Sequence, residues 1–424
     1  MGLAACGIGA NESAPLGARR QQAAEQGAAM QGKLRQAWLT TGLLAAALAL
    51  GTGAAQAQPV VGVTKDTIKV GGFGAMTGPL SNLVAPQLNG VQAVFEEANE
   101  AGGVHGRKIV YVKEDDECLP SKGVGAVKKL IHEIQPFMIV GGGCSNAAIA
   151  QKPEIVDAKI PWVIVGSTAD SLTEPADPYI FTSMSAAWME VYGMLQHAID
   201  QGKKRVAVVW QPDAWGKARI EPMYAALKKA NIEPVLVEEI AVEPTDLTAT
   251  VLKLQAAKAD AVMLILFPKA AVPYLRDAYK FGFQPLSVGG SPLGEIDVIA
   301  KGTGTADAVS NLRSLAAAGY AADDPHVAKW KAIIEKRFPG DRFNVLHMFG
   351  ISAGQFALEA LRKAGPEPTR EKVIQVLSTM TMQTDTYSGP LRCVPGDHQC
   401  HKTLGVFALK DGRVAAVGKT EPKR

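Results

Sequence analysis

The sequence alternates between short runs rich in valine and isoleucine and longer amphipathic segments, and this alternation restricts the fold more than any other feature. We predict strands at Ile68–Val70, Lys108–Val112, Met138–Val140 and Trp162–Val165. The segments between them are long enough for helices, which we predict at Asn89–Glu100, Gly123–Glu133 and Asn146–Ala158. Strands separated by helices form βαβ units, so the pattern predicts a parallel sheet with helices on both faces.

The same rhythm restarts near residue 185. The second block predicts helices at Ser185–Gln201, Trp215–Asn231, Leu247–Ala257 and Val272–Phe281, and strands at Arg205–Trp210, Pro234–Glu239, Ala261–Phe267 and Leu286–Gly289. Further helices follow at residues 327–338, 346–364 and 371–379, and short strands at residues 389–392, 404–409 and 414–417. Since 424 residues exceed one ordinary core, we predict the α/β class with two doubly wound parallel-sheet lobes facing one another.

The N-terminus has the features of a secretory signal peptide. Lys33 and Arg35 form a small positive region before the apolar stretch Ala37–Leu50, and small residues up to Ala57 resemble a cleavage site. The apolar stretch of about 14 residues is too short to span a membrane. We therefore expect residues 1–57 to be an N-terminal extension and a cleaved signal peptide, and the mature protein to be exported.

The composition excludes some classes of function. Hydrophobic residues make up 47% and charged residues 20% of the chain, as in globular proteins, and the net charge of +3 is spread without long basic runs. A nucleic-acid-binding surface usually needs a basic patch, so we expect no nucleic-acid partner.

Four cysteines remain after the predicted cleavage site: Cys118, Cys144, Cys393 and Cys400. An even number in an exported chain favours disulfides over free thiols. Three pairings are open to four cysteines, and the pairing of Cys118 with Cys144 and of Cys393 with Cys400 is the most economical.

The stretch Met138–Asn146 contains an apolar run, three glycines and then Cys144, Ser145 and Asn146, which indicates a strand, a tight turn and a helix N-terminus. Such a terminus presents free backbone N–H groups and favours an anion. A second copy follows at Pro161–Thr168. Ser145 and Thr168 are therefore candidates for binding one carboxylate. The alternative is that both are simple helix caps, and their spacing does not decide between the two.

The sequence matches the motifs of common enzyme classes poorly. Gly71–Gly74 follows a strand, but Thr77 occupies the third glycine position of a dinucleotide fingerprint. Ser145 and Ser167 lack the Gly-x-Ser-x-Gly elbow of a hydrolase. We therefore expect no enzyme activity and no cofactor.

Two groups of residues raise the question of a metal. Cys393, His398, Cys400 and His401 lie close together in sequence, but their spacing matches no standard zinc pattern. A disulfide with two surface histidines is the favoured interpretation. The acidic run Glu114–Glu117 is better explained as a solvated, turn-forming face, so we expect no metal site.

Several motifs together resemble the periplasmic substrate-binding proteins of branched-chain amino acid ABC transporters, the leucine/isoleucine/valine-binding type. The resemblance runs from Ile68 to the C-terminus. It rests on these motifs: Gly74-Ala-Met-Thr-Gly-Pro79, Asn99-Glu-Ala-Gly-Gly-Val-His-Gly106, Asp115-Asp-Glu-Cys118, Gly143-Cys-Ser145 and Gly389-Pro390.

The resemblance implies a type I periplasmic binding protein clamshell whose two lobes are joined by three crossovers. We place the crossovers near Ser183, Leu315 and Gly389. The lobes would then consist of residues 58–183 plus 315–388 and of residues 184–314 plus 389–424. The resemblance also supports a disulfide between Cys118 and Cys144.

It further implies a set of ligand-binding residues. Ser145 and Thr168 would bind the ligand carboxylate, and the backbone carbonyl of Gly166 or its neighbour Ser167 would accept from an ammonium group. On the opposite lobe, Trp215 falls where the family has an aromatic wall and Phe267 where it often has a tyrosine.

The sequence departs from the family where an acidic residue usually pairs with the α-ammonium. We identify Ser291 at this position, unless Glu295 is shifted into the role. The acidic residue that often follows the first crossover is also missing, because Ala186 and Trp188 lie in its place.

The aromatic side chain of the first binding loop is replaced by Asn82 or Leu83. An α-ammonium without a buried countercharge is costly to desolvate. The pocket is therefore expected to prefer an apolar or aromatic carboxylate to a zwitterionic amino acid.

The sequence predicts an extracytoplasmic solute-binding protein of an ABC importer. It would be a monomer that closes around one small carboxylate-bearing apolar solute and delivers it to membrane permease subunits. The alternative is a ligand-sensing domain of a receptor or regulatory system that binds a small amide or amino acid.

Overall fold

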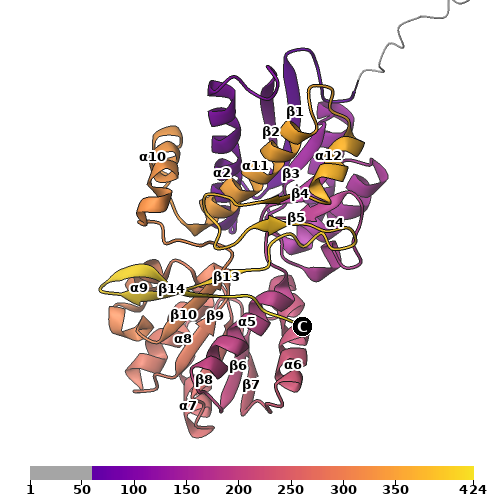
Figure 1. The fold of residues 1–424 in the computed structure, drawn as a ribbon. Coiled ribbons are helices and arrows are strands. Elements are labelled where there is room, and N and C mark those ends of the chain that lie inside the picture. Colours follow the sequence, from indigo (N-terminus) through magenta and orange to yellow (C-terminus); the bar gives the residue numbers. More distant parts are fainter. Residues whose placement is uncertain (1–59) are drawn as a thin grey trace, which may run out of the picture. The chain divides into compact units, whose positions relative to one another are not determined.

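A computed structural model describes residues 60–424, and Figure 1 shows their helices and strands. The predicted N-terminal extension and signal peptide, residues 1–57, lie outside the described residues. The described residues belong to one compact unit. Among their helices, none combines the length and the apolar character that a membrane crossing requires.

The first sheet has five parallel strands in the order β2-β1-β3-β4-β5. They span Thr67–Gly74 (β1), Lys108–Asp115 (β2), Met138–Gly141 (β3), Trp162–Ile164 (β4) and Ile180–Thr182 (β5). Helices α2 and α11 pack together, as do α3 and α4, and α11 also contacts β3 and β4. The helices of this half are α2 (Ser81–Glu100), α3 (Pro120–Lys129), α4 (Ser145–Asp157), α10 (Ala328–Arg337), α11 (Val345–Lys363) and α12 (Arg370–Leu377). Every residue of β3 and β4 is buried, as expected when helices cover both faces.

The second sheet has seven strands in the order β14-β13-β10-β9-β8-β6-β7. They span Val206–Trp210 (β6), Leu236–Glu239 (β7), Ala261–Ile265 (β8), Leu286–Gly289 (β9), Leu312–Ala316 (β10), Leu404–Lys410 (β13) and Arg413–Thr420 (β14). The antiparallel pairs of this sheet are β10–β13 and β13–β14, and the second pair is the hairpin predicted near the C-terminus. The accompanying helices are α5 (Ala187–Asp200), α6 (Ala214–Lys229), α7 (Thr248–Ala256), α8 (Pro268–Lys280) and α9 (Ile296–Thr303). The predicted α/β class with two sheet lobes is confirmed (Figure 1).

Helix α2 begins earlier than the sequence predicts. We expected a helix from Asn89, and a proline such as Pro86 normally interrupts a helix. The helix instead begins at Ser81 and contains Pro86. Pro86 and the residues around it are buried, and α2 packs closely on α11, so tertiary packing compensates for the backbone hydrogen bond that proline cannot make.

The chain passes between the sheets after β5, after β10 and before β13. We expected the last passage at Gly389, whereas the segment beyond it stays with the first sheet. The N–H of Thr182 donates to the carbonyl of His398 at 3.0 Å, and the N–H of Cys400 donates to the carbonyl of Thr182 at 3.1 Å. We therefore propose a third crossover near Thr403.

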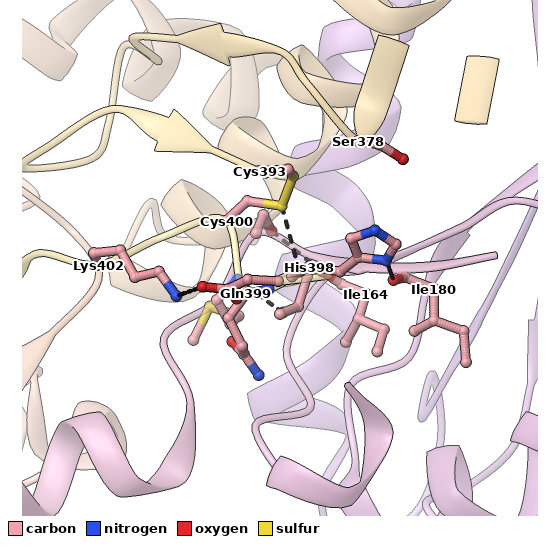
Figure 2. Close-up of a disulfide and its surroundings, with 12 residues drawn as sticks. Ile164, Ile180, Ser378, Cys393, His398, Gln399, Cys400 and Lys402 are labelled. Atoms are coloured by element: carbon pink, nitrogen blue, oxygen red, sulfur yellow. Dashed lines mark hydrogen bonds and ion pairs between the residues drawn. A yellow bond between two sulfur atoms is a disulfide. The ribbon is translucent and has the colours of Figure 1, made fainter. Parts of the chain in front are cut away.

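Both expected disulfides are present, with Cα–Cα distances of 5.4 Å for Cys118–Cys144 and 4.4 Å for Cys393–Cys400. Figure 2 shows the second one beside His398, whose Nδ1 lies 2.9 Å from the carbonyl oxygen of Ile180. The prediction that the nearby histidines are at the surface is wrong. His398 and His401 are both buried. The loop closed by the disulfide docks His398 on the edge strand β5, and His401 contacts Ser185 and Tyr387.

Candidate functional site

A cleft lined by residues of both lobes has an empty volume of about 940 Å³, including the space open to solvent. The part near the first sheet is lined by Leu80, Leu83, Val84, Gln87, Gly143, Cys144, Ser145, Asn146, Gly166, Thr168, Met184, Leu346 and Phe349. The part near the second sheet is lined by Glu190, Asp213, Ala214, Trp215, Arg219, Phe267, Ser291 and Pro292.

Ser145 and Thr168 line the cleft where two neighbouring strands end. Ser145 is the first residue of α4, directly after β3 and its glycines, and Thr168 follows β4. The N–H groups in the first turn of a helix have no acceptor within the helix, and no side chain caps those of α4. Because β3 and β4 are adjacent and parallel, they bring these two donor sites to one edge of the sheet.

The Cys118–Cys144 disulfide supports this edge. Cys144 precedes the helix in an extended conformation, and its sulfur is bonded to the loop after β2. Asn146 adds a second link, since its side-chain Nδ2 donates to the carbonyl of Cys118 at 2.8 Å. Two links therefore tie the start of α4, which carries Ser145, to the loop after β2.

An aromatic pair forms part of the opposite wall. The rings of Trp215, in the first turn of α6, and Phe267, just before α8, have centroids 4.9 Å apart and planes inclined by 30°. The side chain of Gln211 holds the backbone of Phe267, since its Oε1 accepts from the N–H of Phe267 at 2.7 Å. This wall offers an apolar surface to a ligand.

Seven of the ten predicted ligand-binding residues line the cleft: Leu83, Ser145, Gly166, Thr168, Trp215, Phe267 and Ser291. Three do not. Asn82 is exposed, Ser167 is buried and donates through Oγ to the carbonyl of Gly142 at 3.1 Å, and Trp188 packs against Tyr192. Ligand binding by any of the ten residues stays a prediction.

Glu190 and Arg219 form a buried ion pair in the cleft that sequence reasoning missed. We considered an acidic residue absent around Ala186 and Trp188, but Glu190, in the first part of α5, lines the cleft. Its Oε2 accepts from Nε of Arg219 at 2.8 Å and from Nη2 at 2.5 Å, and both side chains are 1% exposed. Helical spacing was the available signal, because Glu190 lies four residues after Ala186 and Arg219 four residues after Trp215.

Ser291 and Glu295 have different environments. Ser291 lines the cleft and donates to Glu190 through both its hydroxyl and its N–H, the latter at 3.2 Å. Glu295 lies outside this cleft, where it accepts from the N–H of Val345 at 3.1 Å and borders a separate cavity. Burial raises the pKa of Glu295, which the Val345 N–H opposes. The expected replacement of the ammonium partner by Glu295 does not fit this geometry.

The acidic run Glu114–Glu117 serves the fold. Asp115 accepts from the N–H of Met76 at 2.9 Å, and Asp116 accepts from the N–H of Cys118 at 2.8 Å. Asp116 is fully buried, which raises its pKa, so the prediction of a solvated face is wrong for this residue. Within residues 60–424 no group of three or more histidine, cysteine or acidic residues could hold a metal ion.

Sequence comparison places this chain among known proteins. The sequence model described as "Periplasmic binding protein" matches residues 67–413. A Leu/Ile/Val-binding protein homolog 7 of Brucella abortus is 27% identical over 233 residues, which are 53% of this chain and 58% of the relative. A leucine-specific-binding protein of Salmonella typhimurium is 25% identical over 202 residues, or 47% of this chain and 54% of the relative. The matched regions thus span less than two thirds of these relatives.

Solved structures share the fold over nearly their whole length. A branched-chain amino acid ABC transporter protein from Thermus thermophilus with bound valine superposes with a TM-score of 0.75 and 22% identity, covering 85% of this chain and 97% of that one. A solute-binding protein of R. palustris in complex with 4-hydroxybenzoate gives a TM-score of 0.72 at 18% identity, covering 85% and 98%. The fold is therefore the type I periplasmic binding protein fold, and with a family match over most of its length this chain belongs to the periplasmic binding protein family.

Proposed function

We propose that this chain is an extracytoplasmic solute-binding protein of an ABC importer that captures a small apolar carboxylate between its lobes. The observation that carries the proposal is the cleft itself. It sets hydrogen-bond donors at two strand ends, around Ser145 and Thr168, opposite the aromatic pair Trp215 and Phe267. One side suits an anionic group and the other an apolar body.

Family membership supports the same function. Relatives include proteins named for leucine or for Leu/Ile/Val binding, and proteins of the same fold are described with bound valine, benzoate or 4-hydroxybenzoate. All these ligands carry a carboxylate on an apolar body. Export to the periplasm and delivery to permease subunits are part of this proposal.

Binding would favour the closed arrangement of the lobes. A ligand that contacts Thr168 on one side and Trp215 on the other makes both sets of contacts only when the lobes are together. Its binding free energy therefore shifts the population towards the closed state, which a permease can distinguish from the empty protein.

The carboxylate assignment is tested by isothermal titration calorimetry with a panel of aliphatic and aromatic acids. In the double variant Ser145→Ala/Thr168→Val, affinity should fall about 100-fold or more, since a hydrogen bond to a charged group contributes about 1.5–3 kcal/mol. Ser171→Ala, an exposed serine, is the matched control and should bind like the parent protein. Methyl esters of the same acids should bind much more weakly. Unchanged affinity in the double variant would contradict the assignment.

A further inference from the structure

Glu190 has no acceptor site left for a ligand. A carboxylate offers two oxygens with about four lone-pair positions. Oε2 accepts twice from Arg219, and Oε1 accepts from the hydroxyl and the N–H of Ser291. An ammonium group entering the cleft would have to displace one of these four donors.

The charge of Glu190 is also compensated. The guanidinium of Arg219 contacts it through two nitrogens, and both side chains are almost completely buried. At such a position the attraction between the charges is only weakly screened by solvent. Glu190 therefore offers no free negative charge to an α-ammonium. The other carboxylate that lines the cleft, Asp213, caps α6, where it accepts from the N–H of Gly216 at 2.7 Å and from Nε2 of Gln211 at 2.8 Å.

Arg219 is held in this role from several sides. Nη1 donates to the carbonyl of Trp215 at 3.1 Å, Nη2 donates to the hydroxyl oxygen of Thr168 at 2.6 Å, and the guanidinium lies 3.9 Å from the centroid of the Trp215 ring. Swinging Arg219 away to free Glu190 would break all of these contacts at once. A ligand ammonium would have to compensate for their loss as well as for its own desolvation.

The same arginine favours a carboxylate. Because the Thr168 oxygen accepts from Arg219, the hydroxyl hydrogen of Thr168 is left to donate elsewhere, and Thr168 lines the cleft. A hydroxyl that accepts from a cation becomes a stronger donor, since hydrogen bonds in a chain polarise one another. Arg219 thus masks the acidic residue and strengthens a donor for the acid group.

We propose that the Arg219–Glu190 pair is the specificity device of this cleft, which selects carboxylates without an α-ammonium group over the corresponding amino acids. This inference rests on the proposed function, because it assumes that the ligand occupies the cleft and presents a carboxylate to Thr168. Arg219 acts here as a positioning residue for Thr168 and as the countercharge of Glu190.

The test compares acids that differ only in the ammonium group. Calorimetry with leucine and 4-methylpentanoate, and with phenylalanine and 3-phenylpropanoate, should show at least about 10-fold tighter binding of the acid without the amine. Every other acid that binds is compared with its α-amino counterpart in the same way. Equal or tighter binding of the amino acids would overturn the inference and leave the proposed function standing. If no carboxylate binds at all, the proposed function fails with it.

Substitutions at Arg219 and Glu190 test whether the preference for acids without an amine comes from this ion pair. Arg219→Met uncovers Glu190, so the affinity ratio should shift towards the amino acid by about 10-fold or more. Lys217→Met removes a positive charge from an exposed position of the same helix and should leave the ratio unchanged. An unshifted ratio in folded Arg219→Met would count against the proposal.

Glu190→Gln is the second variant, and it keeps the proposal testable if Arg219→Met does not fold. With the carboxylate gone, Arg219 is no longer neutralised, so acids without an amine should bind at least as tightly as before and keep their advantage. A selective loss of amino-acid binding in Glu190→Gln would show that Glu190 contacts an ammonium in the parent protein, and the inference would be wrong.

Discussion

The crossing of helices α2 and α11 gives the sharpest prediction for stability. A Cβ added at Gly350 of α11 would lie 1.8 Å from the backbone oxygen of Gln87, and one added at Gly90 of α2 would lie 2.4 Å from that of His347. The two helices are therefore in backbone contact at this crossing. Neither obstructing atom belongs to a flexible side chain, so Gly350→Ala can be accommodated only if the helices move apart.

The expected cost follows from this geometry. Overpacking a well-filled core costs about 1–3 kcal/mol, and a clash with backbone belongs at the upper end of that range. Alanine recovers about 1 kcal/mol of helix propensity, so we expect Gly350→Ala to lower the unfolding free energy by about 2 kcal/mol. The change should also weaken ligand binding, because Phe349 of α11 and Gln87 of α2 line the cleft.

Gly125 provides the matched control. It lies in α3 with nothing within 4 Å of an added Cβ, so Gly125→Ala should stabilise the protein by about 0.5–1 kcal/mol. Urea denaturation followed by circular dichroism measures both variants. Equal stability of Gly350→Ala and the parent protein would refute the close helix crossing.

Two further predictions concern stability. Burial, and then the charge of Glu174, raise the pKa of Asp170 from 3.8 to about 6, so this group's stabilising contribution is present below about pH 4 and is lost as the pH rises through 6. The loss amounts to at most about 3 kcal/mol, and Asp170→Asn should abolish it; parallel stability–pH curves for the variant and the parent would contradict this. Replacing both cysteines of Cys118–Cys144 by serine should cost about 3.5 kcal/mol, against about 2.4 kcal/mol for Cys393–Cys400, because the loops span 26 and 7 residues. Denaturant titration of the two double variants measures the difference, and the reverse order would contradict the loop-entropy argument.

Features encoded by neighbouring residues were predictable from the sequence. Strands and helices follow from hydrophobic periodicity, and Ser145 and Thr168 could be placed at one sheet edge because parallel strands end on the same side. The two disulfides follow from the number and spacing of the cysteines. In each case the signal lies in a local pattern or in the order and spacing of residues along the chain.

Features created by packing between distant segments were not predictable in this way. Pro86 signals a helix break, yet contact with α11 keeps it inside α2. His398 and His401 have the sequence context of surface residues but are buried, the first by docking on β5 and the second against Ser185 and Tyr387. Helical spacing points to Glu190 and to Arg219 separately, but their pairing depends on α5 packing against α6, which the sequence around either residue does not indicate.

Thr168 shows how these two kinds of information combine in the cleft. Its position after β4 could be predicted from the local sequence and makes it a candidate hydrogen-bond donor to a ligand carboxylate. Its hydrogen bond from Arg219 of α6 links the two lobes, and Thr168 is itself proposed to bind the ligand. A carboxylate that accepts from the Thr168 hydroxyl would polarise it and strengthen the bond from Arg219, because linked hydrogen bonds reinforce one another. Ligand binding and the contact between the lobes would then be coupled through one side chain, and Thr168→Val should weaken both affinity and ligand-induced closure while Ser145→Ala weakens mainly affinity. Small-angle X-ray scattering with and without ligand separates the two effects, and equal closure in both variants at saturating ligand would contradict the coupling.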